Sequence, residues 1–288
     1  MGETVEIFEV GPRDGLQNEK RPIAARDKIA LVNLLSEAGF HRIEVASFVS
    51  PKRVPQMANS ADVLGGIRRH NGVIYSALTP NLQGFEQAMD AGANEVAIFS
   101  SASEGFSQAN INCSIAESLQ RFRPVMDAAR AENVKVRGYV SCVTDCPYDG
   151  PVPALQVADV ANDLFQLGCY EVSLGDTIGA GTQASVSKML TAVLDVIPAK
   201  NLAGHFHDTK GNAMANIQVS LDHGLRIFDA AVGGLGGCPF APGAAGNVST
   251  EAVHQFLLDA GYETGLDAEL LMKAADAARH MRSGGANA

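Results

Sequence analysis

Two histidines stand one residue apart in the segment GHFHDTKGN at residues 204–212. His205 and His207 end an apolar run that is typical of a buried strand, and side chains two positions apart on a strand share one face. Two imidazoles on one face can form half of a metal site, whereas an isolated H-x-H pair also occurs with both rings bonded to nearby backbone. The same alternation sends Asp208 to the opposite face, so we expect a structural or supporting role for its carboxylate.

Other reactive side chains lie within or just after further strand-like runs. In chain order they are Arg13, Asp14, Gln17, Glu44, Tyr139, Asp176, Cys238 and Asn247. In a parallel barrel the carboxyl ends of all strands meet at one mouth, and chemistry takes place there. Polar residues scattered through a core would not gather at one end, so the pattern predicts a single site.

Asp14 and Asn247 can complete a metal site with the two histidines. Two nitrogens, one carboxylate and one amide oxygen make four ligands and leave two octahedral positions open. A structural zinc site would be closed. The donor set therefore favours Mg²⁺ or Mn²⁺ with a substrate that binds through two oxygens.

Arg13 and Glu44 are charged residues that need partners in this arrangement. A fixed guanidinium beside a metal stabilises a developing oxyanion, with a surface ion pair as the alternative for Arg13. Glu44 lies in an apolar strand and must be paired there, so we expect it to bind Arg13 or otherwise to support the site. Tyr139 and Asp176 could position substrate or bond to metal ligands, with a role in the core as the alternative.

Cys238 lies in the glycine-rich segment GGLGGCPFAPGAAGN at residues 233–247. A thiol with an ordinary pKa of about 8.5 can donate a proton to a carbanion near neutral pH. The glycines would let the segment close over a substrate, or they could cradle a phosphate. A buried small hydrophobe is the alternative for the cysteine.

Strand-like and helical patterns alternate along the whole chain, and they must position these residues. The predicted strands are residues 4–10, 42–47, 73–79, 95–101, 135–141, 171–176, 202–208 and 226–232. Four of them follow a helix pattern that ends in a Gly, which suits a left-handed helix C-cap. The repeat predicts an α/β fold, a (β/α)₈ TIM barrel in one domain over residues 1–288, with an additional C-terminal helix at 266–283. A doubly wound open sheet is disfavoured because no G-x-G-x-x-G follows the first strand.

The composition excludes several classes of protein. A net charge of −10 over 288 residues argues against a nucleic-acid partner, and no apolar run is long enough to cross a membrane. The negative charge is concentrated after residue 70, so an anionic ligand would be received better by the basic loops near the N-terminus. Five scattered cysteines argue against a disulfide framework, and no targeting segment precedes the first strand. We therefore expect a cytoplasmic protein.

Three segments together resemble the 3-hydroxy-3-methylglutaryl-CoA (HMG-CoA) lyases, within the wider group of metal-dependent Claisen-type lyases and synthases built on a barrel. They are VGPRDGLQNE at 10–19, GHFHDTKGNAMANI at 204–217 and GLGGCPFAPGAAGNVSTE at 234–251. The third segment is the most specific, because related condensing synthases share the Arg-Asp and H-x-H elements but not the cysteine loop. Residues 230–233 depart from the family pattern without affecting a catalytic position, and no cysteine follows Cys238 to link subunits.

The resemblance implies a carbon–carbon lyase that cleaves (S)-3-hydroxy-3-methylglutaryl-CoA to acetyl-CoA and acetoacetate, as in leucine degradation and ketone-body metabolism. It implies a Mg²⁺ or Mn²⁺ site, a CoA thioester bound near the basic N-terminal loops, and a homo-oligomer, with a dimer expected. The implied roles are metal binding by Asp14, His205, His207 and Asn247, proton removal by His205, enolate stabilisation by Arg13, substrate contacts by Arg13, Gln17 and Tyr139, proton donation by Cys238 or water, and support by Asp176 and Glu44.

Three alternatives remain open at this point. A synthase that condenses acetyl-CoA with a keto acid would use the same chemistry in reverse and would not need Cys238. A lyase for a related hydroxyacyl-CoA would differ only in its substrate profile. A barrel that binds ligand without catalysis is disfavoured because every site residue type is present.

Overall fold

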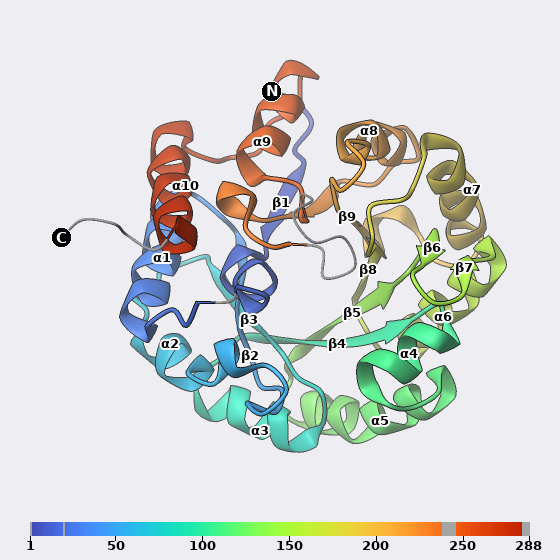
Figure 1. The fold of residues 1–288 in the computed structure, drawn as a ribbon, viewed down its shortest axis with the longest axis horizontal. Helices are drawn as coiled ribbons and strands as arrows, with labels where there is room; N and C mark the ends of the chain where they lie inside the picture. Colours follow the sequence, from blue (N-terminus) through green and yellow to red (C-terminus); the bar gives the residue numbers. More distant parts are fainter. Residues whose placement is uncertain (1, 20, 238–245, 284–288) are drawn as a thin grey trace.

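Eight parallel strands form a closed barrel in the computed structural model, which describes residues 2–19, 21–237 and 246–283 (Figure 1). The order around the barrel is β1-β10-β9-β8-β5-β4-β3-β2. These strands are β1 (Glu6–Glu9), β2 (Arg42–Ser47), β3 (Ile74–Leu78), β4 (Glu95–Ser101), β5 (Lys135–Ser141), β8 (Glu171–Asp176), β9 (Leu202–Phe206) and β10 (Ile227–Ala230). The predicted TIM barrel is thus confirmed, and β2, β4, β5 and β8 have the predicted bounds.

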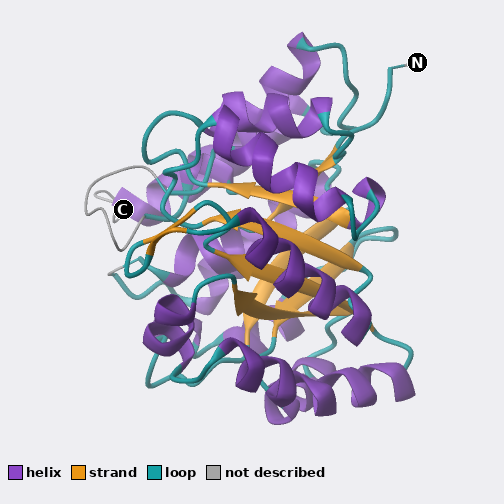
Figure 2. Cartoon of the chain, turned by 90° about the vertical axis from the view of Figure 1, so that its right-hand side faces the viewer, coloured by secondary structure: helices purple, strands orange, loops and turns teal. Residues whose placement is uncertain are grey.

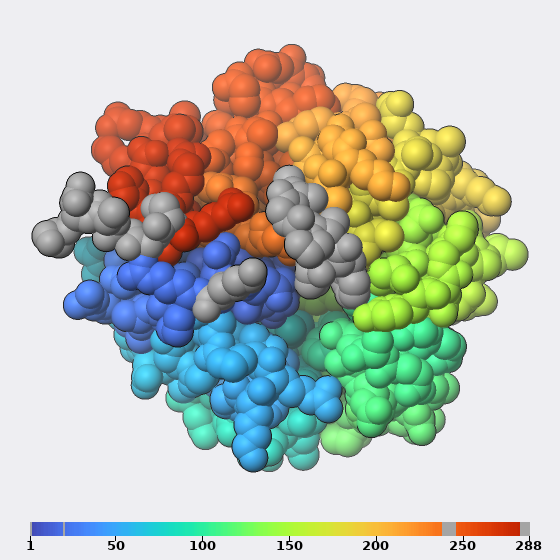
Figure 3. Space-filling view, viewed as in Figure 1, coloured from blue at the N-terminus to red at the C-terminus, as the bar shows by residue number. Residues whose placement is uncertain are grey.

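Helices surround the barrel on its outer side (Figure 2). They are α1 (Ala25–Glu37), α2 (Ser60–Gly66), α3 (Leu82–Asp90), α4 (Glu104–Ile111), α5 (Ile115–Ala131), α6 (Ala154–Leu167), α7 (Gln183–Leu194), α8 (Ala213–Asp222), α9 (Thr250–Asp259) and α10 (Ala268–Ser283). The additional C-terminal helix is α10, and it packs against α1, so the last helix of the ring lies beside the first (Figure 3). Among the described residues no helix is long and apolar enough to span a membrane.

Glycines turn the chain from helix to strand at the four predicted positions. Gly39, Gly92, Gly168 and Gly224 have φ angles of 95°, 87°, 118° and 91°. A side chain is strained in this left-handed region, whereas glycine adopts it freely. The left-handed glycine that the repeat predicted between a helix and the next strand is therefore observed in the backbone.

Short elements were not predicted from the sequence. A hairpin of β6 (Asp145–Cys146) and β7 (Gly150–Pro151) follows β5, and two-residue strands are too short to give a periodic pattern. A π-helical turn, η1 (Gly11–Gly15), follows β1 directly. Short 3₁₀ turns are η2 (Pro55–Met57), η3 (Ala199–Asn201) and η4 (Val232–Gly234).

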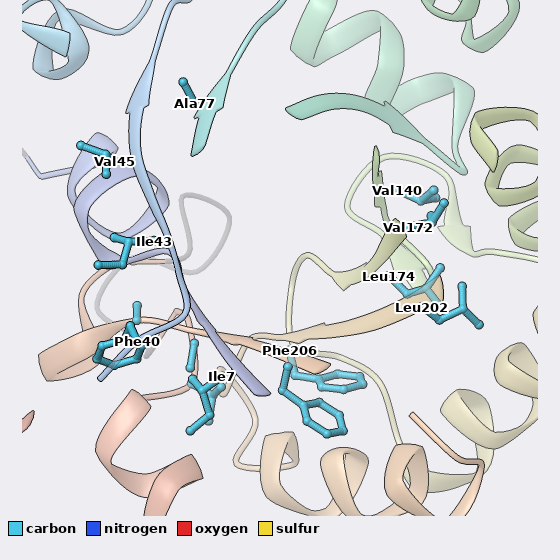
Figure 4. Close-up of a cluster of buried hydrophobic side chains, with 14 of the residues drawn as sticks. Ile7, Phe40, Ile43, Val45, Ala77, Val140, Val172, Leu174, Leu202 and Phe206 are labelled. Carbon is cyan, nitrogen blue, oxygen red and sulfur yellow. The ribbon is translucent and has the colours of Figure 1, made fainter. Parts of the chain in front are cut away.

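The barrel wall separates an apolar layer from a polar interior. Side chains such as Ile43, Leu174 and Phe206 belong to the buried hydrophobic layer that packs beneath the helices (Figure 4). Alternate positions carry buried polar groups, which include Glu44 and His205. This alternation follows from the two-residue period of a strand. It explains why a polar side chain in an apolar run belongs to the interior of this barrel.

Candidate active site

Asp14, His205 and His207 come together at the mouth of the barrel. Their ligand atoms all lie within 4.8 Å of one another, and His205 Nε2 is 4.0 Å from Asp14 Oδ2. Asp14 is carried by η1, directly after β1, whereas His205 lies in β9. The strand β10 stands between β1 and β9 in the barrel, so closure of the barrel brings these distant segments close together. The predicted grouping of these three residues is observed.

Asn247 joins the same cluster from the segment before α9. Its backbone pairs with that of His207 in an isolated bridge, and its Nδ2 donates to Asp14 Oδ2 at 2.8 Å. This pairing also explains why β9 ends at Phe206 and not at the predicted residue 208, since the chain leaves the barrel sheet to contact residue 247. All four predicted ligand residues are therefore neighbours.

Arg13 links the carboxylates of Asp14 and Glu44. Its Nε donates to Glu44 Oε2 at 2.6 Å, and its Nη1 donates to Asp14 Oδ1 at 2.6 Å. Arg13 is 5% exposed and Glu44 is fully buried, so the pair is held away from water. The expected partner of Glu44 is thus confirmed. The Oε1 atom of Glu44 has no hydrogen-bond partner within the described part of the chain.

The charge of Asp14 is stabilised by its neighbours. Burial by itself would raise the pKa of Asp14, but Arg13 and the two histidines outweigh it and lower this pKa to about 2. Asp14 is therefore a carboxylate at neutral pH, and a carboxylate oxygen is a good ligand for a hard divalent cation.

His207 has an uncharged ring, and one of its nitrogens has no hydrogen-bond partner among the described residues. Burial and the nearby His205 lower the pKa of His207 to about 4. No hydrogen bond to its buried Nδ1 is found among the described residues. A neutral imidazole with an unsatisfied nitrogen beside a carboxylate fits a metal ligand, because metals bind the deprotonated form.

His205 is oriented by Asp229, a residue that sequence reasoning did not select. Its Nδ1 lies 3.1 Å from Asp229 Oδ2, which leaves Nε2 on the side of Asp14. Arg137 and Ser173 bind the same carboxylate. Burial opposes ionisation of Asp229, but the Arg137 charge holds its pKa below the usual range. In the sequence, Asp229 is a single acidic residue within an apolar predicted strand. Such a residue needs a partner, but the sequence does not show which residue that partner is.

Tyr139 and Gln17 lie beside this cluster. The Tyr139 ring stands edge-on to His205 with centroids 6.4 Å apart, and the Arg13 guanidinium carbon is 5.6 Å from the Tyr139 centroid. Gln17 Nε2 is 3.4 Å from Asp14 Oδ1. With Arg13, all three predicted substrate-contacting residues are thus next to the candidate ligands.

Asp176 and Asp208 bind loop backbone instead. Asp176 accepts hydrogen bonds from the backbone N–H of Gly181 at 2.9 Å and from the Thr144 hydroxyl at 2.9 Å, so it organises the loop after β8. It is not part of the described cluster of ligand atoms. Asp208 accepts from the Ala213 N–H at the start of α8, as expected for a structural role. Cys238 lies outside the described residues.

Comparisons with known proteins find relatives that match almost the whole chain. A family model described as HMGL-like matches residues 4–277. A Pseudomonas aeruginosa protein named 3-hydroxy-3-isohexenylglutaryl-CoA/hydroxy-methylglutaryl-CoA lyase is 59% identical over 94% of this chain and 90% of its own length. The crystal structure of an HMG-CoA lyase from Brucella melitensis superposes with a TM-score of 0.97 at 60% identity, covering 98% of this chain and 99% of that one. An HMG-CoA lyase from Acinetobacter baumannii in complex with coenzyme A and 3-methylmalate has a TM-score of 0.92 at 36% identity, covering 97% and 92%.

Proposed function

Because this chain belongs to the HMGL-like family, we propose that it cleaves (S)-3-hydroxy-3-methylglutaryl-CoA to acetyl-CoA and acetoacetate with the aid of a divalent cation. The observation that carries the proposal is the cluster of Asp14, His205 and His207 at the barrel mouth, with Arg13 beside it. The relative that is 59% identical is named as a lyase for this type of substrate, which supports the same reaction.

The residues of the cluster fit a divalent cation. Asp14 would supply a carboxylate oxygen, His205 and His207 would supply ring nitrogens, and Asn247 would supply its amide oxygen. The unsatisfied His207 Nδ1 and the ionised Asp14 support this assignment. A mixed oxygen and nitrogen set with open positions suits Mg²⁺ or Mn²⁺, and the bound cation would lower the pKa of the substrate hydroxyl.

The chain's own residues would carry the remaining chemistry. His205, as a ligand of the cation, would help the tertiary hydroxyl to lose its proton, and the carbon–carbon bond would then break with its electrons passing to the thioester as an enolate. Arg13, held by Glu44, would stabilise the enolate oxygen. Cys238 would return a proton to the enolate carbon, with water as the alternative donor. Gln17 and Tyr139 would contact the substrate.

Asp176 would act indirectly. Since its carboxylate binds Gly181 and Thr144, its proposed role is to hold the loop after β8 beside the mouth.

Coenzyme A is the proposed carrier of the substrate. The Acinetobacter relative was solved with coenzyme A, and this chain exposes Arg21, Lys52 and Arg53 in its N-terminal loops. Cationic side chains there would attract the phosphates of the cofactor. We further propose a homodimer, a cytoplasmic location and one domain over residues 1–288.

A larger substrate is a second candidate. The name of the Pseudomonas relative covers two thioesters that differ in the group on C3. Leu78, Ala97 and Tyr139 form a small buried apolar cluster with Phe99 against it. Tyr139 also stands edge-on to His205, so an apolar C3 group of a substrate bound beside His205 would meet an apolar surface there. A comparison of kcat/KM for the methyl and isohexenyl thioesters separates the two candidates.

The direct test is incubation of the purified protein with HMG-CoA and Mn²⁺ or Mg²⁺, followed by measurement of acetoacetate. We expect product that disappears when the metal is chelated. Activity only with acetyl-CoA and a keto acid would instead support a synthase, and failure of both reactions would support a binding barrel.

A further inference from the structure

Asp229 is held directly beside His205 by the barrel sheet. The two residues are register partners in the parallel pair β9–β10. Their side chains meet at 3.1 Å, between His205 Nδ1 and Asp229 Oδ2. Asp229 is 2% exposed, so water does not compete for this contact.

The other hydrogen bonds of Asp229 keep it an acceptor. Arg137 donates to both of its oxygens, through Nη2 at 2.7 Å and Nη1 at 3.1 Å, and the Ser173 hydroxyl donates at 2.8 Å. A carboxylate that binds a guanidinium in this way has no proton to give. The shared proton must therefore belong to His205 Nδ1.

We propose that Asp229 is a positioning residue that fixes His205 as the Nδ1–H tautomer and so presents the Nε2 lone pair to the metal-binding cluster. The inference rests on the metal site proposed above. Metal-binding histidines commonly donate their second N–H to a carboxylate, which sets both the tautomer and the angle of the ring. Arg137 in β5 and Ser173 in β8 hold Asp229 in place, so these two strands help to orient His205 in β9.

The charge network offers a matched control. Glu171 is a second buried carboxylate that binds Arg137, at 2.6 Å from Nε to Oε1. Its remaining hydrogen bonds come from Arg42. Asp229→Asn and Glu171→Gln each remove one carboxylate from Arg137, but only the first replaces the carboxylate that bonds to His205.

The test measures Mn²⁺ affinity from the electron paramagnetic resonance signal of free Mn²⁺, without substrate. We expect Asp229→Asn to weaken binding about 10- to 100-fold, which is the usual cost of removing such a partner. Glu171→Gln should stay within about twofold of the unmodified protein, because it leaves the contact between His205 and Asp229 in place. Equal losses in both variants, or no loss in either, would overturn the proposal.

A measurement on the unmodified protein keeps the test decisive if the variants do not fold. Long-range ¹H–¹⁵N spectra of histidine-labelled, metal-free protein report each ring tautomer, and the His205 signals are those that vanish in His205→Gln. We expect a proton on Nδ1, whether or not Nε2 also carries one in the metal-free ring. A ring protonated at Nε2 alone would refute the assignment of Asp229. If the unmodified protein binds no Mn²⁺, the proposed metal site fails, whereas the tautomer still decides the role of Asp229.

Discussion

The buried carboxyl group of Glu9 should make the stability of this protein depend on pH. Glu9 ends β1 and is fully buried. It accepts hydrogen bonds from the backbone N–H groups of Gly11 at 2.7 Å and Val232 at 3.0 Å, and from the Thr250 hydroxyl at 2.7 Å. It therefore ties the turn that carries Asp14 to the segments around β10 and α9. Burial raises its pKa from 4.5 to about 7, although these hydrogen bonds oppose the shift.

The sign and size of the effect follow from that shift. Below about pH 4.5 the group is protonated in both the folded and the unfolded chain. Between pH 4.5 and about 7 the unfolded chain releases the proton while the folded chain keeps it, so the free energy of unfolding falls. At about 1.4 kcal/mol per pKa unit, the loss approaches ~3 kcal/mol once the pH exceeds the folded pKa.

Glu9→Gln removes this titration and keeps the contacts. The amide oxygen can accept from both backbone N–H groups, and the Thr250 hydroxyl can turn to accept from the amide nitrogen. We expect the variant to gain stability relative to the unmodified protein as the pH rises from 5 to 8. Urea denaturation at each pH measures the difference. A difference that stays constant over this range would refute a raised pKa for Glu9.

Three further predictions concern the candidate ligands and the cysteine loop. His207→Ala should weaken Mn²⁺ binding by more than about 100-fold, since loss of an indirect partner alone costs 10- to 100-fold; unchanged affinity in a titration would remove His207 from the ligand set. Cys238→Ala should lower turnover by about 10²- to 10⁴-fold and leave Mn²⁺ affinity unchanged, and normal acetoacetate production would exclude the thiol as proton donor. Gly236→Ala should cost more than about 1 kcal/mol of unfolding free energy and weaken metal binding, because Gly236 has a φ of 101° and an added Cβ would lie 2.9 Å from Asn247 Nδ2. Gly237→Ala is its control, since no atom of the described residues lies within 4 Å of the added Cβ, and equal effects in both variants would contradict the steric argument.

Local patterns allowed much of the fold to be predicted. Alternating hydrophobicity located the eight barrel strands, and single glycines located four helix ends, since each depends on residues close in the chain. The hairpin of β6 and β7 was missed because its strands are too short to show a period. That residues 1–288 form one domain and that Cys238 donates a proton stay predictions.

The sequence by itself determined that His205 and His207 share a face, because a strand has a period of two residues. It also determined that Glu44 needs a partner, because an isolated charge in an apolar strand is costly. Only the tertiary structure decided that the expected partners do meet, and it added Asp229 as a partner of His205. Asn247 and Asp14 are 233 positions apart in the chain, yet their side chains meet at 2.8 Å. Closure of the barrel brings β1 and β9 to either side of β10, and the register of β9 and β10 sets Asp229 against His205. Such contacts depend on three-dimensional packing between distant segments, and no local pattern encodes them.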